Sequence, residues 1–287
     1  MKIFRKKRTI NCGGKLLDLS APVIMGILNV TPDSFYADSR ISGEKEIAVR
    51  AEAIVSEGGT IIDIGGYSSR PDAADIDERE EYSRIRPAMA LVKKHFPDTF
   101  ISVDTFRSNI VKQLYEEFGS FIVNDISAGN IDSRMIPCLG KSGLPYIAMH
   151  MRGTPKTMQD RENCVYGDIV AEIVSYFVRK KGELINAGVM DIIIDPGFGF
   201  SKTLDGNYEL LAGMDSFKIL ELPVLAGISR KSMLYKLLDI TPEESLSATI
   251  AGNVLALQNG ADILRVHDVK AASDAVKVFA EVNKYSV

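Results

Sequence analysis

Short runs of aliphatic and β-branched residues recur along this chain, and most of them end in a small polar cluster. The runs begin near residues 23, 60, 100, 121, 145, 191, 223 and 262. Uninterrupted apolar runs are typical of parallel strands that are covered on both faces. Their mean spacing of about 34 residues suits repeating units of strand, loop and helix. The pattern therefore predicts eight parallel strands with polar residues at their carboxyl ends.

Segments with the apolar spacing of amphipathic helices lie between these runs. They cover residues 44–57, 78–96, 108–118, 166–187, 243–259 and 269–285. Gly119, Gly188 and Gly260 stand where three of these helices should end, because glycine accepts the left-handed conformation common at helix C-termini. Thr241 followed by Pro242 predicts the N-terminus of the fifth helix.

The start of the chain predicts a small separate element. Residues 2–20 contain two strand-like stretches around the turn at residues 11–15, which indicates a β-hairpin that closes the lower end of a barrel. Strands alternating with helices predict an α/β fold, and eight such units predict a (β/α)8 TIM barrel of roughly 250 residues. No low-complexity linker divides the chain, so we expect a single domain over residues 1–287 with the hairpin at residues 1–20. Chemistry in such barrels lies at the carboxyl ends of the strands, which indicates an enzyme.

Composition narrows the class of protein. The chain has 287 residues, 46% hydrophobic content and a formal net charge of −4, which argues against a nucleic-acid-binding surface. Cys12, Cys138 and Cys164 are an odd number without CxxC spacing, so they predict reduced thiols rather than disulfides or a zinc site. The first residues lack an apolar signal core, and no run approaches the roughly 20 apolar residues of a membrane span. We therefore expect a soluble, cytoplasmic protein.

Carboxylates follow several of the predicted strands. Asp63, Asp104, Asp125 and Asp195 all lie at or near strand ends. Any one of them alone is better explained as a helix cap or a loop ion pair. Together, Asp104, Asn124 and Asp195 form a rim rich in hydrogen-bond acceptors at the top of three strands. Such a rim suits a ligand with several N–H donors, such as an amino-substituted nitrogen heterocycle.

Candidate cations follow the last two strands. Arg265 and His267 alternate along the eighth strand, so their side chains point the same way. Lys231 follows the seventh strand, where a helix should begin. Loops after strands seven and eight are the usual anion-binding site of such barrels, so the expected ligand is a phosphate or pyrophosphate group. The alternative is that Arg265 pairs with Asp268 and that His267 packs in the wall.

Hard oxygen ligands and long loops complete the upper face. Asn29 and residues 31–33 offer oxygens near the anion site, and Mg²⁺ is typically held by one or two protein oxygens and substrate phosphates. Residues 31–40 and 67–73 form long polar loops after the first two strands, a type of connection that often acts as a lid. His95 is predicted to face solvent, and His150 is interpreted as a buried wall residue.

Seven of these segments together resemble the dihydropteroate synthase family of folate biosynthesis, and the similarity runs from Val23 to His267. The matching segments are Gly26–Phe35, Asp63–Pro71, Val103–Thr105, Asn124–Ser127, Asp195–Phe200, Ser229–Ser232 and Arg265–Asp268. The resemblance implies condensation of 6-hydroxymethyl-7,8-dihydropterin pyrophosphate with p-aminobenzoate, giving 7,8-dihydropteroate and pyrophosphate with Mg²⁺. It also implies a homodimer formed through the last helices, with small molecules as the other partners.

The resemblance assigns roles to positions of this chain. The pterin ring is expected at Asp104, Asn124, Asp195 and Lys231. The aminobenzoate is expected at Ser69, Pro71, Phe200, Lys231 and Ser232. Pyrophosphate is expected at Asn29, Ser69, Arg70, Arg265 and His267, with the metal at Asn29. Among these, Arg70, Lys231, Arg265 and His267 are the expected catalytic residues, and Arg70 is expected on a lid over the leaving group.

The implied chemistry is a dissociative substitution. Pyrophosphate leaves from a CH₂ beside an electron-rich dihydropterin, so positive charge spreads into the ring. Mg²⁺, Arg265 and His267 stabilise the leaving charge, while Asp104 and Asp195 favour a cationic ring. The neutral amine then attacks with little need for a general base.

Two other functions remain open, and one departure from the family bears on them. A pterin-binding barrel of the methyltetrahydrofolate methyltransferase type shares the acidic rim but needs no anion site. A non-catalytic homologue that binds pterin or serves as a partner subunit is the second alternative. The family's second loop commonly reads Glu-Ser-Thr-Arg, whereas this chain has Tyr67-Ser68-Ser69-Arg70. The departure leaves lid packing, the aminobenzoate pocket and the sulfonamide response open.

Overall fold

Parallel strands form a closed ring in the computed structural model, which describes residues 7–30, 40–68 and 75–285. Eight strands pair side by side in the order β8-β7-β6-β5-β4-β3-β10-β9. An isolated parallel bridge between Ile194 and Val224 joins β8 to the residue before β9 and closes the ring. The strands are β3 (Val23–Asn29), β4 (Ile61–Gly65), β5 (Phe100–Asp104), β6 (Ile122–Asp125), β7 (Tyr146–Met149), β8 (Ile192–Asp195), β9 (Leu225–Ala226) and β10 (Ile263–Val266). The (β/α)8 barrel and its eight strands are confirmed.

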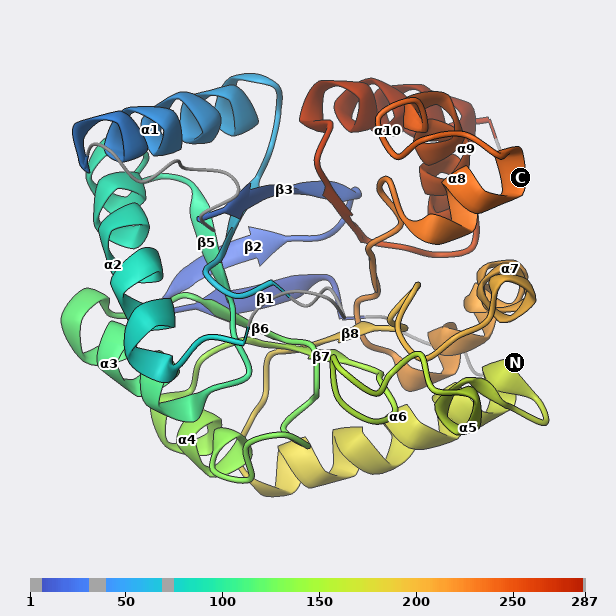
Figure 1. Cartoon of the computed structure of the whole chain (residues 1–287), viewed down its shortest axis with the longest axis horizontal. Coiled ribbons are helices and arrows are strands. Elements are labelled where there is room, and N and C mark those ends of the chain that lie inside the picture. The colour runs from blue at the N-terminus through green and yellow to red at the C-terminus, as the bar shows by residue number, and fades with distance from the viewer. Residues whose placement is uncertain (1–6, 31–39, 69–74, 286–287) are drawn as a thin grey trace.

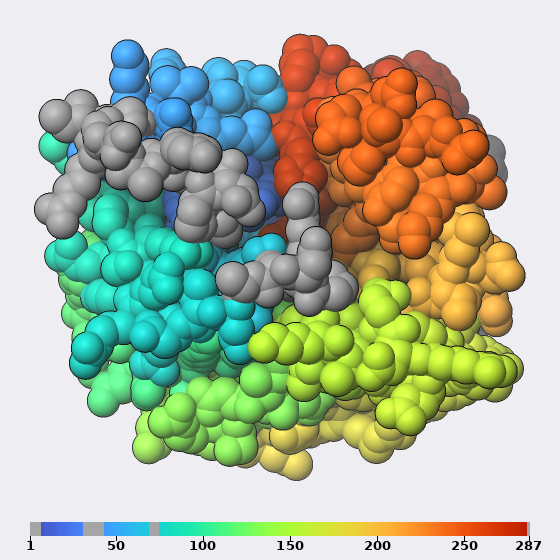
Figure 2. All heavy atoms as spheres, viewed as in Figure 1, coloured from blue at the N-terminus to red at the C-terminus, as the bar shows by residue number. Residues whose placement is uncertain are grey.

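Helices surround the ring, and the elements follow one another around its centre in chain order (Figures 1 and 2). They are α1 (Arg40–Ser56), α2 (Glu78–His95), α3 (Ser108–Phe118), α4 (Met135–Ser142), α5 (Arg161–Cys164), α6 (Ile169–Asn186), α7 (Leu204–Ala212), a 3₁₀ helix η1 (Met214–Leu220), α8 (Ser232–Leu238), α9 (Leu246–Gln258) and α10 (Val269–Asn283). Gly119, Gly188 and Gly260 follow α3, α6 and α9 and have the predicted positive φ. None of the described helices is long and apolar enough to cross a membrane.

Three predicted helices begin three or four residues away from their predicted starts, and the first of them, α1, begins at Arg40 instead of residue 44. The helix predicted over residues 166–187 is α6, which begins at Ile169, and the short helix α5 before it was not predicted. The helix predicted from residue 243 begins at Leu246. Arg230 donates to the carbonyl oxygens of Pro242 and Glu243 at 2.8 and 2.7 Å, which engages two acceptors that an earlier helical turn would use. The Thr241 cap is therefore part of a turn before the helix.

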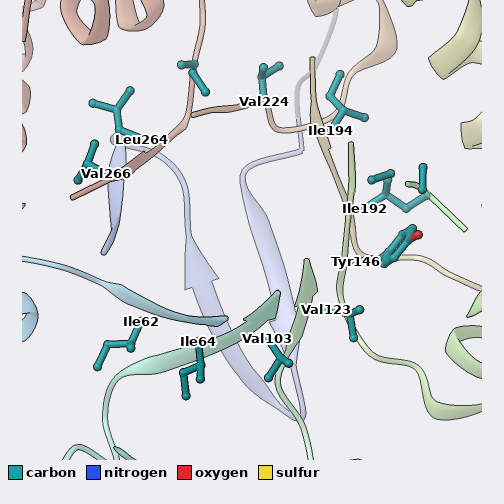
Figure 3. Packing of buried hydrophobic residues seen from close by; sticks show 14 of the residues in the cluster. Ile62, Ile64, Val103, Val123, Tyr146, Ile192, Ile194, Val224, Leu264 and Val266 are labelled. Carbon is teal, nitrogen blue, oxygen red and sulfur yellow. The ribbon is translucent and has the colours of Figure 1, made fainter. Parts of the chain in front are cut away.

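The outer face of the barrel packs against the helices. Successive side chains of a strand point to opposite faces, so every second residue faces outward. Figure 3 shows outward-facing residues from neighbouring strands, including Ile62, Ile64, Val103 and Val123, which belong to the large buried cluster beneath the helices. Both faces of each strand are thus covered, which explains the uninterrupted apolar runs of the sequence.

The inner face begins with one apolar layer. Each of the eight strands contributes one buried residue to it: Met25, Ile61, Phe100, Ile122, Ile147, Ile193, Leu225 and Ile263. The antiparallel strands β1 (Thr9–Cys12) and β2 (Lys15–Asp18) form the predicted hairpin. Ile10 and Leu17 of the hairpin pack onto this layer, so the hairpin closes the lower end of the barrel as predicted.

The next inward-facing layer is mostly polar. Two residues farther along each strand the interior holds Ile27, Asp63, Ser102, Asn124, Met149, Asp195, Gly227 and Arg265. The apolar core of the barrel is therefore one layer deep, and most residues of the polar layer line a cavity at the carboxyl ends of the strands.

Close packing between two outer helices depends on one glycine. A methyl group added at Gly140 of α4 would lie 1.9 Å from the carbonyl oxygen of Ala187 at the end of α6. A methyl group at Gly182 of α6 would meet no atom within 4 Å. Both glycines lie within helices, so the two sites differ only in the room available for an added methyl group.

We expect Gly140→Ala to lower the free energy of unfolding by about 3 kcal/mol, because two backbones must separate to admit the methyl group. Gly182→Ala should raise it by up to about 1 kcal/mol through helix propensity. Urea unfolding of both variants measures the difference. Equal stabilities of the two variants would contradict this packing.

Candidate active site

A cavity of about 500 Å³ opens at the carboxyl ends of the strands. Its lining comes from segments spread over the whole chain: Ile27, Asn29, Tyr67, Ser68, Asp104, Asn124, Ile126, Met149, Asp195, Phe200, Gly227, Ser229, Arg230, Lys231, Arg265 and His267. The cavity thus contains all three residues of the predicted acceptor rim and all three predicted cations. A closed parallel ring brings them together, because it places every strand's carboxyl end at the same mouth.

Arg265 is held between two carboxylates at the floor of the cavity. Its Nε donates to Asp63 Oδ2 and its Nη2 donates to Asp104 Oδ2, each at 2.6 Å. Burial raises the pKa of Asp104 to about 7 against the opposing charge of Arg265, and the Asp63 carboxylate adds to the rise. The alternative pairing of Arg265 with Asp268 is wrong, since Asp268 forms two hydrogen bonds with Arg230 at 2.8 and 2.9 Å.

Asn124 and Asp195 face the cavity from β6 and β8, the strands on either side of β7. Asn124 Nδ2 donates to Asp63 Oδ2 at 3.2 Å, within the same polar layer. Asp195 Oδ1 accepts from the backbone N–H of Gly197 at 2.7 Å, which fixes this carboxylate at the start of the following loop. Burial raises the pKa of Asp195, although the positive charge of Lys231 opposes the rise.

Lys231 joins the carboxylate side of the cavity to an aromatic wall. It caps α8, as the sequence predicts, and its Nζ donates to the carbonyl oxygen of Phe198. The same Nζ lies 4.6 Å from the centroid of the Phe200 ring, within the range of a cation–π contact. Burial lowers the pKa of Lys231 to about 8, and Asp195 opposes the shift. This amine can therefore change its charge near neutral pH.

His267 lines the cavity as a neutral group. Burial and the positive charge of Arg265 lower the pKa of His267 to about 4. The sequence-based interpretation of His267 as a cation is therefore wrong at pH 7. Its backbone carbonyl accepts from Arg50 Nη2 at 2.6 Å, and its N–H donates to Ser229 Oγ at 3.2 Å. The imidazole can donate or accept a hydrogen bond but contributes no charge.

A buried lysine supports the loop after β8 from below. Lys202 Nζ donates to the carbonyl oxygens of Gly197 and Phe200 at 2.9 and 2.8 Å, and lies 3.3 Å from His150 Nδ1. Burial lowers the pKa of Lys202 to about 7, and it lowers that of His150 well below its usual value. His150 is the buried wall residue that the sequence predicts, and His95 is exposed as predicted.

One predicted carboxylate faces away from the cavity. Asp125 accepts hydrogen bonds from the backbone N–H and hydroxyl of Ser127, from the N–H of Gly129 and from the hydroxyl of Tyr146, all within 2.8 Å. Because Asn124 points inward, the next residue must point outward. Asp125 therefore stabilises a loop, which is the alternative that the sequence left open for each carboxylate.

Several predicted residues have no described place in the cavity. Ser69, Arg70 and Pro71, and residues 31–33, lie outside the described residues. Ser232 is the first residue of α8 and does not line the cavity, although its neighbour Lys231 does. Asn29 lines the cavity as expected, beside Asp104 and His267.

Other lining residues were not predicted from the sequence. Met149 and Ile126 form apolar parts of the wall. Tyr67 and Ser68, by contrast, begin the loop after β4 that the sequence predicts at this face. Met149 lies two residues after the core residue Ile147 and points to the same face of the strand. The two-residue alternation of strand side chains could therefore have identified Met149. Tyr67 packs edge-on against Phe106 at a centroid distance of 5.2 Å, a contact between two loops that sequence spacing does not reveal.

The chain is similar to known proteins over nearly its whole length. The model of the pterin binding enzyme family matches residues 25–267. The dihydropteroate synthase of Escherichia coli (strain K12) is 40% identical over 267 residues, which cover 92% of this chain and 93% of that protein.

Solved structures agree with this match. The Yersinia pestis dihydropteroate synthase in a sulfonamide drug complex has a TM-score of 0.88 and 37% identity, covering 96% of this chain and 99% of that one. The Xanthomonas albilineans enzyme in complex with 7,8-dihydropteroate has a TM-score of 0.85 and 32% identity, covering 97% and 100%. With the acceptor rim and the cations in one cavity, these similarities show that the chain belongs to the dihydropteroate synthase family of pterin-binding enzymes.

Proposed function

We propose that this protein condenses 6-hydroxymethyl-7,8-dihydropterin pyrophosphate with p-aminobenzoate to give 7,8-dihydropteroate and pyrophosphate. The observation that carries the proposal is the single cavity in which an acceptor rim, Asp104, Asn124 and Asp195, lies beside Arg265 and Lys231. A methyltransferase-type pterin barrel would need the rim alone. Because cations line the same cavity as the rim, a substrate that carries both a nitrogen heterocycle and an anionic group is favoured.

The acceptor rim supports recognition of the pterin ring. The amino, amide and ring N–H groups of a pterin need acceptors, and Asp104 and Asp195 offer carboxylate oxygens from β5 and β8. Arg265 and Lys231 keep these two carboxylates from carrying an unpaired buried charge. The ring can thus bind among charges that the protein has already arranged.

The leaving diphosphate fits the side of the cavity formed by Arg265, His267 and Asn29. After its bonds to Asp63 and Asp104, the Arg265 guanidinium keeps three of its five N–H donors for a ligand. The pKa of His267 is lowered to about 4 by burial and by the charge of Arg265, so in the free protein its imidazole is a neutral hydrogen-bonding group on this side. Negative charge that develops on the leaving group is stabilised by donors fixed in advance.

A magnesium ion fits the same side of the cavity, with the substrate as co-ligand. Among the described residues no group of three or more His, Cys, Asp or Glu side chains could hold a metal. Asn29 supplies one hard amide oxygen at the cavity wall. One protein oxygen with diphosphate oxygens and water is the usual manner of magnesium binding. When bound, the ion would neutralise charge on the diphosphate.

The charges around the floor favour a dissociative substitution. Asp104 and Asp195 line the floor and Asp63 lies buried beside it, so three carboxylates surround the two cations Arg265 and Lys231. An excess of negative charge stabilises a pterin ring that becomes positive as the diphosphate leaves. The aromatic amine attacks as a neutral nucleophile, and its proton is lost after the C–N bond forms.

The aminobenzoate is expected against the wall formed by Phe200 and Lys231, next to Ser232 at the start of α8. The ring of Phe200 and the ammonium of Lys231 already form an aromatic and cationic wall. A benzene ring with a carboxylate is complementary to such a wall. Sulfonamides carry the same aniline ring, so we propose that they compete at this site, with Ser69, Arg70 and Pro71 in their family roles.

We further propose a homodimer and a cytoplasmic location. A groove of about 630 Å³ between α9 and α10 is lined by Ile250, Val254, Val278 and Phe279 among others. Val278 is 66% exposed, and an apolar groove between two helices suits a self-complementary interface. The free thiols of Cys12, Cys138 and Cys164 support a reducing compartment.

The first test is pyrophosphate release from the purified protein supplied with dihydropterin pyrophosphate, p-aminobenzoate and Mg²⁺. We expect release that stops when any one of the three is left out, because bond cleavage and amine attack use one cavity. Omission of the protein is the control. Binding of the pterin substrate without release would instead support the non-catalytic homologue, and neither binding nor release would contradict the proposal.

The rate should follow a bell-shaped dependence on pH. Asp104, with its pKa raised to about 7, takes up a proton below that pH and loses an acceptor. Lys231, with its pKa lowered to about 8, loses its charge above that pH. We expect kcat/KM for the pterin substrate to be highest between these values and to fall on both sides. A profile that stays flat from about pH 6 to about pH 9 would contradict both assignments.

The dimer should depend on the exposed face of α10. Val278→Glu places a charge in the proposed interface and is expected to convert the dimer largely to monomer in analytical ultracentrifugation. Val178→Glu is the matched control, since Val178 lies on α6 and is 56% exposed. The two variants sedimenting alike would count against this interface.

A further inference from the structure

A carboxylate that does not reach the cavity joins two of the groups that do. Asp63 on β4 belongs to the polar layer of the interior but is fully buried and does not line the cavity. Its Oδ2 accepts from Arg265 Nε at 2.6 Å and from Asn124 Nδ2 at 3.2 Å. Its Oδ1 lies 3.5 Å from the same Asn124 Nδ2. Both oxygens of Asp63 therefore face the NH₂ group of one amide.

These contacts fix which end of the Asn124 amide a ligand meets. A carboxylate only accepts hydrogen bonds, so the amide group that faces Asp63 must be the NH₂ donor. The reversed amide would place its oxygen 3.2 and 3.5 Å from two carboxylate oxygens, which is repulsive. Asn124 lines the cavity. Its carbonyl oxygen is therefore the end left to accept an N–H of the ligand.

The neighbouring residue in this layer provides a comparison. Ser102 on β5 is the register partner of Asp63 and is also fully buried. Its hydroxyl has no hydrogen-bond partner among the described residues. Two adjacent buried polar side chains thus differ in one respect, because only Asp63 contacts groups of the cavity floor.

We propose that Asp63 is a positioning residue, whose buried carboxylate holds the Asn124 amide with its oxygen toward the pterin while it anchors Arg265 on the diphosphate side. The Asp63 carboxylate thus holds one residue at the pterin end of the site and one at the diphosphate end. This inference deepens the proposed function and rests on it.

Exchanging the amide and the carboxylate tests the arrangement. In Asn124→Asp two carboxylates lie about 3.2 Å apart, and such a pair resists full ionisation. We expect binding of 6-hydroxymethyl-7,8-dihydropterin, measured by calorimetry at about pH 8, to weaken at least tenfold. Compared with the wild type at the same pH, the loss should shrink toward acidic pH as the pair takes up one proton.

The double variant Asp63→Asn with Asn124→Asp should restore binding at about pH 8 to within about threefold of the wild type. The amide introduced at position 63 donates to the carboxylate at position 124, and its oxygen still accepts from Arg265. The pair keeps the net charge of the wild type. Ser102→Ala combined with Asn124→Asp is the matched control, and it should stay as weak as Asn124→Asp alone.

The outcomes separate this inference from the proposed function. A wild type that does not bind the pterin would overturn the proposed function itself. A wild type that binds, with a double variant that does not recover, would overturn the role of Asp63. If Asn124→Asp alone does not fold, the double variant still decides, because a restored pair should both fold and bind the pterin. Thermal unfolding of each variant identifies that case.

Discussion

The ion pairs of Arg265 with Asp63 and Asp104 hold the centre of this molecule together. They link β10 to β4 and β5 at the level where the barrel interior changes from apolar core to ligand cavity. A buried guanidinium is tolerated only where carboxylates surround it, and removing one partner leaves a charge without compensation. Because Asn124 also donates to Asp63, the same interaction orients part of the acceptor rim. Geometry and charge at the cavity floor are thus set by one cluster.

The chemistry of the site follows from a core only one layer deep. Below the polar layer, residues such as Met25 and Phe100 pack against the N-terminal hairpin and exclude water from that end. Polar groups above this layer are buried from beneath and open only toward the mouth. Burial therefore moves the pKa of Asp104 to about 7 and that of Lys231 to about 8, on either side of neutrality. A fold that encloses its charges in this way prepares them for a substrate that changes charge during the reaction.

The strands and the long helices could be predicted from the sequence, because their apolar patterns are long or uninterrupted. All eight strands begin within two residues of the predicted positions, because each is buried on both faces and reads as an apolar run. The short helices α4 and α7 were not predicted. Pro137 and Gly140 interrupt the helical pattern in α4, and Gly206 and Asn207 do so in α7. Packing onto the barrel stabilises both despite this weak local preference.

The sequence by itself determined the barrel, the hairpin and the family, because strand periodicity and local motifs are properties of neighbouring residues. It also placed Asp104, Asn124, Asp195 and Arg265 at strand ends, where the closed ring makes them neighbours. Only the tertiary structure decided which charges pair, since Arg265 and Asp63 are 202 residues apart in the chain. It likewise decided that His267 is neutral, because pKa values depend on burial and on charges from other strands, which no local pattern encodes.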